Sequence, residues 1–209
     1  MPSRAEMSKP SGPLTFTPSR DRRQHALVRW RLDRERVLSR VDAIQRGAHR
    51  AADAVRVIRV VSGSGQNLRL NPETGAVAFA DGALSYKAGD SAAGSAPSVL
   101  GAAYTNSLGG AMSTTLYVID TRKDSLAIQA PPNEGVLTTV GRLGVNVSGP
   151  LGFDISARDG KAYLLAHRPG TDRSRLFSVN LGTGSARKLG IVRRAPDLVA
   201  FAAISRPPA

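Results

Sequence analysis

The chain has 209 residues, enough for one domain with a sizeable hydrophobic core or for one domain and an appendage. It contains no cysteine, which excludes disulfides, cysteine-ligated zinc and thiol catalysis. Its net charge of +13 is unevenly placed: residues 1–50 hold 12 Lys and Arg against 5 Asp and Glu, so about half of the excess lies in a quarter of the chain.

Residues 1–20 are predicted to be a disordered N-terminus. They hold several prolines and little apolar side chain to bury. They also lack the apolar core of a signal peptide, and no apolar run in the chain approaches the ~18 residues of a membrane span. As encoded, the chain is therefore expected to be cytoplasmic and without a membrane span.

Residues 21–51 are Arg-rich and poor in glycine, and residues 22–46 are predicted to form a basic N-terminal helix. One apolar arc of ~120° contains Leu27, Trp30, Val37, Leu38, Val41 and Ile44. The favoured interpretation is a solvated helix that docks through Trp30. The alternative is nucleic-acid binding or contact with an anionic membrane. The nucleic-acid alternative would use Arg22, Arg23, Arg29, Arg31, Arg36 and Arg40.

From residue 52 the composition changes, and residues 52–205 are predicted to form an all-β domain, followed by a tail at 206–209. Short apolar or β-branched runs are separated by turns rich in Gly, Pro, Asn and Asp. In chain order the predicted strands are 55–61, 67–71, 76–84, 100–105, 114–119, 126–128, 136–143, 151–156, 161–167, 175–181, 185–192 and 198–204.

The strands follow a repeat. The segment LRLNPETG at 68–75 matches FSVNLGTG at 177–184 in its apolar positions, Asn, Thr and Gly. The period is about 50 residues with four strands each, which is typical of β-propeller blades. This predicts about three four-stranded antiparallel blades, an incomplete propeller. The first copy lacks a leading strand, and pairing it with residues 198–204 would close a ring.

Three segments carry a family resemblance: VVSGSGQNLRLNPETGAV, then AAYTNSLGGAMSTTLYVIDTRKDSLAIQAPPNEGVLTTVGRLGV, then GFDIS. They resemble the bacterial domain-of-unknown-function family numbered 4394 over roughly Ala51 to Ile204. The resemblance implies a propeller-like fold and supplies no catalytic residue. Its members are often exported and usually carry further strand-rich sequence before the first segment. Residues 1–50 match neither feature, which suggests an aberrant gene start and a possible fragment.

The sequence offers little chemistry. His25, His49 and His167 have no metal-ligand spacing, so no metal is predicted, and no motif for a nucleotide cofactor or a nucleophile elbow occurs. Asp154 is the one weak catalytic candidate, because its strand is predicted to lie near a propeller channel. A structural, hydrogen-bonded role for Asp154 is favoured, since no second acidic residue shares its motif. Asp120 is predicted to cap a turn.

Tyrosines occur in three of the predicted strands. Tyr104, Tyr117 and Tyr163 are interpreted as packing residues between blades, with a sugar-stacking row as the alternative.

These observations favour a non-enzymatic propeller-like interaction domain that binds a protein or a glycan through its loops. The main alternative is a hydrolase or lyase that acts in the channel, and no cofactor is predicted. Three blades are fewer than the ~4–8 that close known propellers. We therefore expect open blade faces and self-association.

Overall fold

The computed structural model describes residues 43–47, 57–106, 112–149, 151–167, 171 and 173–193, with side chains for all of these except 43–47 and 193. They form an all-β protein, as predicted, and its strands lie in three sheets. No helix in this part of the chain is long and apolar enough to cross a membrane. The predicted disordered N-terminus and most of the predicted helix lie outside the described residues.

The sheets follow one another along the chain. Sheet A has the order β1 (Ala43–Gly47), β2 (Val57–Val61), β3 (Asn67–Leu70) and β4 (Val77–Ala80). Sheet B has the order β5 (Ser85–Tyr86), β9 (Val136–Arg142), β8 (Ser125–Gln129), β7 (Leu116–Asp120) and β6 (Val99–Tyr104). Sheet C has the order β10 (Leu151–Ile155), β11 (Ala162–His167), β12 (Arg173–Val179) and β13 (Ala186–Arg193). All pairs are antiparallel except β5 with β9.

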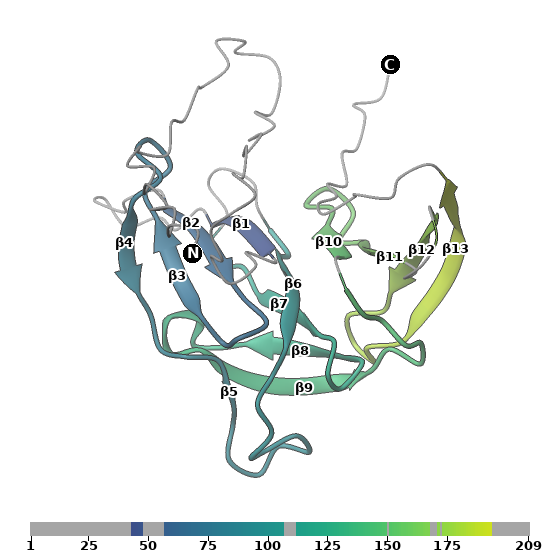
Figure 1. Cartoon of the computed structure of the whole chain (residues 1–209), viewed down its shortest axis with the longest axis horizontal. Helices are drawn as coiled ribbons and strands as arrows, with labels where there is room; N and C mark the ends of the chain where they lie inside the picture. The colour runs from purple at the N-terminus through teal and green to yellow at the C-terminus, as the bar shows by residue number, and fades with distance from the viewer. Residues whose placement is uncertain are drawn as a thin grey trace, which may run out of the picture.

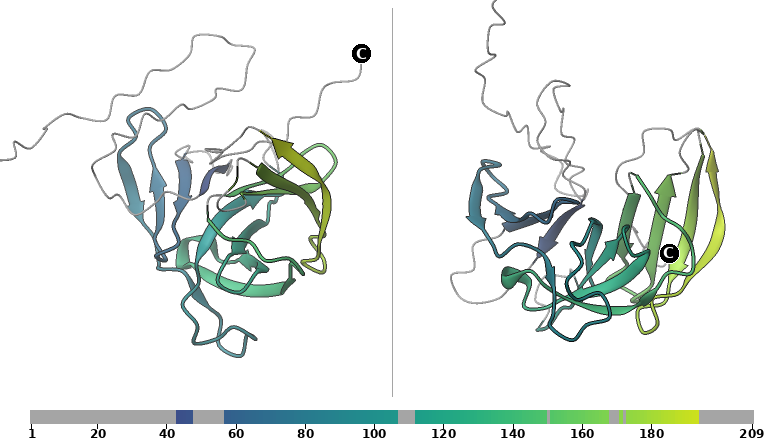
Figure 2. Two further views of the ribbon diagram at one scale, coloured as in Figure 1. Left: turned by 45° about the vertical axis from the view of Figure 1, so that its right-hand side comes forward. Right: turned by 60° about the horizontal axis from the view of Figure 1, so that its bottom comes forward.

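Sheet B lies between sheets A and C, and the three together form an arc that is open on one side (Figures 1 and 2). The first strands of sheets A and C, β1 and β10, both approach β6 of sheet B near the centre of the arc. The last strands, β4 and β13, lie on its outside (Figure 1).

Two apolar clusters fill the spaces between the sheets. The larger cluster joins sheets B and C and includes Ile119, Leu126, Phe153, Leu164 and Phe177. The smaller cluster joins sheets A and B, and there Val61 is the residue from sheet A. Each cluster removes a continuous apolar surface from water, which is the main stabilising term for a sheet that cannot bury its faces alone.

The two matching sequence segments form matching turns. At 71–75 the Asn71 side chain accepts the backbone N–H of residues 73 and 74, and Gly75 N–H donates to the Asn71 carbonyl. At 180–184 Asn180 and Gly184 make the same bonds. Gly75 and Gly184 both have φ near +75°, at 71° and 80°, which only glycine adopts without strain. The shared sequence therefore predicted a shared local structure.

Three details of the prediction are wrong. Residues 43–46 were expected to end the helix, but they lie in β1, which pairs with β2. Because β1 pairs with that edge of β2, the first copy does have a leading strand. Residues 198–204 lie outside the described part of the chain.

The third error concerns residues 76–84, which do not form one strand. β4 ends at Ala80, where Asp81 N–H donates to the Asn67 carbonyl and Gly82 N–H donates to the Asn133 carbonyl in the turn between β8 and β9. The chain then leaves sheet A, and Ser85 and Tyr86 pair with β9. Sheet B therefore has five strands where four were expected.

Candidate functional site

The weak catalytic candidate of the sequence, Asp154, lies in β10 opposite Tyr163 of β11. Its side chain is half-buried and is engaged by another group of the protein. Among the described residues, no group of three His, Cys, Asp or Glu side chains comes close enough to hold a metal ion. The candidate arginines between residues 22 and 40 lie outside the described residues, as do His25 and His49.

The tyrosines named from the sequence occupy packing positions in two of three cases. Tyr104 is buried in the cluster between sheets A and B, and its hydroxyl oxygen accepts a hydrogen bond from Arg59 Nε at 3.2 Å. Tyr117 packs against the cluster between sheets B and C. Tyr163 is half-buried in β11. Tyr104 and Tyr117 therefore support a packing role over a sugar-stacking row.

A buried polar network, which the sequence analysis missed, joins sheet A to sheet B. Its centre is Arg59 of β2, which is 4% exposed. The guanidinium donates to Asp81 Oδ2 at 2.9 Å and to the Pro132 carbonyl at 3.2 Å. It also donates to the side-chain oxygens of Asn67 and Asn133. The network anchors the turn between β8 and β9 to the end of β4.

Asp81 is shared between two arginines. Arg69 of β3 donates to both carboxylate oxygens, with Nη2 at 2.9 Å from Oδ1 and Nε at 2.9 Å from Oδ2. The Arg69 guanidinium also lies 4.0 Å from the ring centre of Phe79. A single Arg inside the apolar run VIRVV signals this pair, because an arginine in a buried strand must find an anion.

A second buried pair lies in sheet B. The Tyr86 hydroxyl donates to Asp120 Oδ2 at 2.6 Å, and Asp120 is fully buried. Burial, followed by the hydrogen bond and the negative charge of Asp120, raises the pKa of Tyr86 well above its ordinary value. Asp120 Oδ1 accepts the N–H of Ser98 and of Arg122, so the predicted turn-capping role of Asp120 is confirmed.

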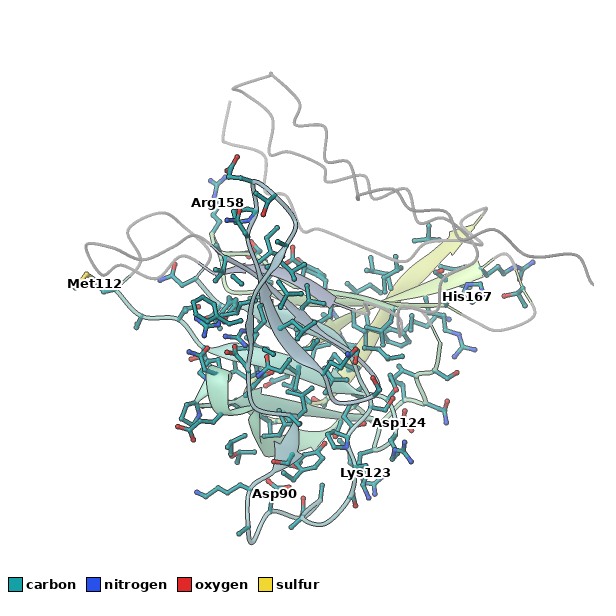
Figure 3. All side chains as sticks on the ribbon, turned by 60° about the vertical axis from the view of Figure 1, so that its left-hand side comes forward. Asp90, Met112, Lys123, Asp124, Arg158 and His167 are labelled. Atoms are coloured by element: carbon teal, nitrogen blue, oxygen red, sulfur yellow. The ribbon has the colours of Figure 1, made fainter. Side chains whose placement is uncertain are left out.

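The loops that carry Asp90 and Asp124 lie toward one end of the molecule. Figure 3 shows Asp90, Lys123 and Asp124 at this end and Arg158 at the opposite end. Although burial opposes the shift, hydrogen bonds from the Thr139 hydroxyl and from the N–H groups of Ala92 and Thr139 lower the pKa of Asp90. Asp90 therefore stays ionised and fixes its loop on β9.

The same end carries a small pocket between the turn after β7 and the chain that follows β9. Its volume is about 200 Å³, and it is lined by Asp124, Arg142, Gly144, Val145 and Asn146. The pocket wall is tied together: Asp124 Oδ1 accepts Val147 N–H at 2.8 Å, and the Asp124 carbonyl accepts Leu143 N–H at 2.8 Å. Within the described residues Arg142 forms no ion pair, and its side chain is exposed.

A comparison with protein families gives one match, over residues 51–202, to the family described as Domain of unknown function (DUF4394). The chain belongs to this family. The resemblance stated from three sequence segments is thereby confirmed, because the match spans most of the predicted β domain. No curated protein matches the DUF4394 chain.

Four of the acidic side chains in the described part of this DUF4394 chain are held by other groups of the protein. Asp90, Asp120 and Asp124 each accept backbone N–H groups, and Asp81 is neutralised by two arginines. A general acid or base must exchange its proton with a substrate, so carboxylates held in this way are poor candidates for that role. The pocket, in contrast, offers the Arg142 cation, the Asn146 amide and backbone groups beside the carboxylate of Asp124.

Proposed function

We propose that the DUF4394 chain is a propeller-like, non-enzymatic binding domain whose three sheets act as blades. The arc of three sheets around β1, β6 and β10 and the matching turns at 71–75 and 180–184 support this view. A stack of this kind presents its loops at the two ends of a rigid body, and those loops are where such scaffolds bind their ligands.

The observation that carries the proposal is the pocket at residues 142–146. At about 200 Å³ it is smaller than the roughly 300–1,000 Å³ that enclose a small molecule, so it suits one group of a larger ligand. Among the described residues the Arg142 guanidinium has no ion-pair partner, which favours an acidic group, and Asn146 adds an amide that donates and accepts. A protein or glycan with a carboxylate fits these features.

Preorganisation is the reason that this pocket suits binding. Asp124 is held by two backbone N–H donors, and Asp124 itself has a positive φ of 48°, an uncommon conformation that keeps the turn in one shape. A loop that is already ordered loses little entropy when it binds, so a modest contact area can give measurable affinity.

The experiment is a binding survey on the full chain by ¹H–¹⁵N correlation spectra. The probes are oligogalacturonate, neutral maltohexaose and a poly-glutamate peptide. We expect an acidic probe to shift the amide signals of residues 121–124 and 142–147, and Arg142→Ala to abolish the shifts. Lys161→Ala is the control, because Lys161 is an exposed cation that pairs with Asp159 away from the pocket.

Two results would overturn the proposal. In the first, acidic probes shift signals elsewhere, or the shifts survive Arg142→Ala. In the second, the chain converts a probe into shorter products and Asp154→Asn stops the conversion, which would establish the hydrolase or lyase alternative.

A further inference from the structure

The two end sheets of the arc carry complementary halves of a contact that already exists inside the molecule. We propose that a second copy of this chain docks head to tail, with its sheet A on sheet C of the first copy, so that two copies close one ring of six sheets. This proposal concerns the end sheets and does not depend on the pocket at residues 142–146.

The internal contact joins sheet C to sheet B. We call the 180–184 turn of sheet C its inserting half and the part of β9 around Gly141 its receiving half. The 180–184 turn of sheet C lies directly on β9 of sheet B, so closely that a Cβ atom added at Gly184 would come within 2.5 Å of the Gly141 carbonyl oxygen. A Cβ atom added at Gly141 would overlap the Thr183 carbonyl. Glycine on both sides is what allows the two backbones to meet.

Sheet C repeats the receiving half of this contact. In β9, Gly141 lies opposite Leu126 at a break in the strand register, and in β13, Gly190 lies opposite Leu176 at the same kind of break. Among the described residues, no atom lies within 4 Å of a Cβ built at Gly190. Gly190 therefore has the position and the backbone of Gly141 but receives no turn.

Sheet A repeats the inserting half. The 71–75 turn has the hydrogen bonds of the 180–184 turn, including the bonds to the Asn side chain. Gly184 is buried by its contact with β9, whereas Gly75 is only half-buried. The inserting turn of sheet A thus has the right shape and lacks the strand that it would cover.

Apolar side chains beside the two halves follow the same logic. Val140, one residue before Gly141, and Ala186, just after the 180–184 turn, both pack against the cluster between sheets B and C. Their counterparts at the ends of the arc are exposed: Leu189 is 43% exposed and Val77 is 57% exposed. Head-to-tail docking would cover these two side chains, as the internal contact covers Val140 and Ala186.

Closure by two copies follows from the blade count. Two copies of three sheets, joined by this contact at both ends, give a ring of six sheets. Six lies within the ~4–8 that form closed rings. In that ring each copy contributes both an inserting and a receiving half, so no end is left over. Among the described strands β4 and β13 keep one unpaired edge each, but these edges face outward in such an assembly.

The test measures the mass of the full chain by light scattering and the dissociation constant by sedimentation equilibrium. We expect a dimer of twice 22.0 kDa. Gly190→Val fills the receiving site without strain, because Gly190 does not have a positive φ. Val77→Glu puts a charge on the inserting half. Each variant should raise the dissociation constant at least tenfold. Far-ultraviolet circular dichroism should show that both variants stay folded.

Mixing the two variants gives the decisive result. A mixed dimer has one junction in which both halves are intact and one junction in which both halves are altered. Because a junction that is already broken by one substitution loses nothing more from the second, the mixture should dimerise more tightly than either variant alone. Thr138→Val and Thr138→Glu, at an exposed position of β9, are matched controls and should leave the dimer unchanged. A monomeric chain, a dimer insensitive to either variant, or a mixture that gains nothing would each overturn the proposal. A monomer would mean that another segment of the same chain fills the receiving site.

Discussion

Replacing Arg59 with methionine tests whether the buried polar network holds sheet A on sheet B. Methionine keeps much of the volume of arginine and removes the charge and all the donors. The substitution removes the hydrogen bonds that the guanidinium donates to Asn67, Asp81, Tyr104, Pro132 and Asn133. The oxygens of Asn67, Asp81 and Tyr104 that accepted those bonds stay buried, and the loss of a donor to a buried acceptor carries the larger share of the cost.

The magnitude follows from the burial of the pair. Removing one partner of a buried ion pair costs about 3–5 kcal/mol. Asp81 keeps its hydrogen bonds to Arg69, so its charge is not left alone, and we expect a loss of about 3–4 kcal/mol for Arg59→Met. Arg69→Met is the matched control: the Arg69 side chain is 22% exposed, and its loss should cost about 1 kcal/mol.

The assay is urea unfolding followed by far-ultraviolet circular dichroism, with the free energy extrapolated to water. A double-mutant cycle with Asp81→Asn should give a coupling energy of about 1–3 kcal/mol between Arg59 and Asp81. A loss below about 1 kcal/mol for Arg59→Met, or equal losses for Arg59→Met and Arg69→Met, would refute the reasoning. Either outcome would mean that water reaches the guanidinium and that the network is not what joins the sheets.

Three further predictions use the same unfolding assay. Phe153→Ala should lower the free energy of unfolding by about 3–5 kcal/mol, because Phe153 is buried between sheets B and C. Leu70→Ala should lower it by only about 1 kcal/mol, because Leu70 is half-buried. Equal losses would contradict this difference in burial. Gly141→Ala should destabilise strongly because its Cβ meets backbone, whereas Gly190→Ala should not destabilise the folded chain; a tolerated Gly141→Ala would show that the turn can move away. The folded state holds the Tyr86 proton more tightly than the unfolded chain does, so the contribution of Tyr86 to the free energy of unfolding is complete below pH 10.0 and is lost as the pH rises above it. Tyr86→Phe should therefore flatten the decline of stability at alkaline pH. An unchanged decline would contradict the assignment.

The all-β fold could be predicted because its strands are punctuated by turns with a clear chemistry. The Asn-x-x-Thr-Gly segments ending at Gly75 and Gly184 specify their turns by local hydrogen bonds and a positive φ. Local signals of this kind are readable from one sequence. The strand β1 carried no such signal. The apolar residues around it have helical spacing, and a short apolar run of this kind fits a helix or a strand equally well.

The candidate site could not be predicted to the same extent. Arg59 and Asn133 are 74 residues apart in sequence, and their contact depends on how two sheets pack, which no local pattern encodes. Arg142 and Asp124 meet at the pocket because β8 and β9 pair within sheet B, where Ser125 lies opposite Arg142. Asp120 was predicted correctly because its partner Arg122 N–H is two residues away. Sequence distance between partners therefore separates the successes from the failures.

The two junctions between sheets are built differently, and this difference has a consequence for function. The junction of sheets B and C is a broad apolar cluster, with the 180–184 turn packed on β9 and a backbone hydrogen bond from Ala186 N–H to the Leu143 carbonyl. The junction of sheets A and B adds Arg59, whose planar donors have acceptors in both sheets, and directional bonds permit only one orientation. The inserting turn at 71–75 belongs to sheet A, so the Arg59 network sets where that turn points. Arg59→Met should therefore weaken dimerisation as well as folding, whereas Phe153→Ala should weaken folding alone at concentrations where the chain stays native.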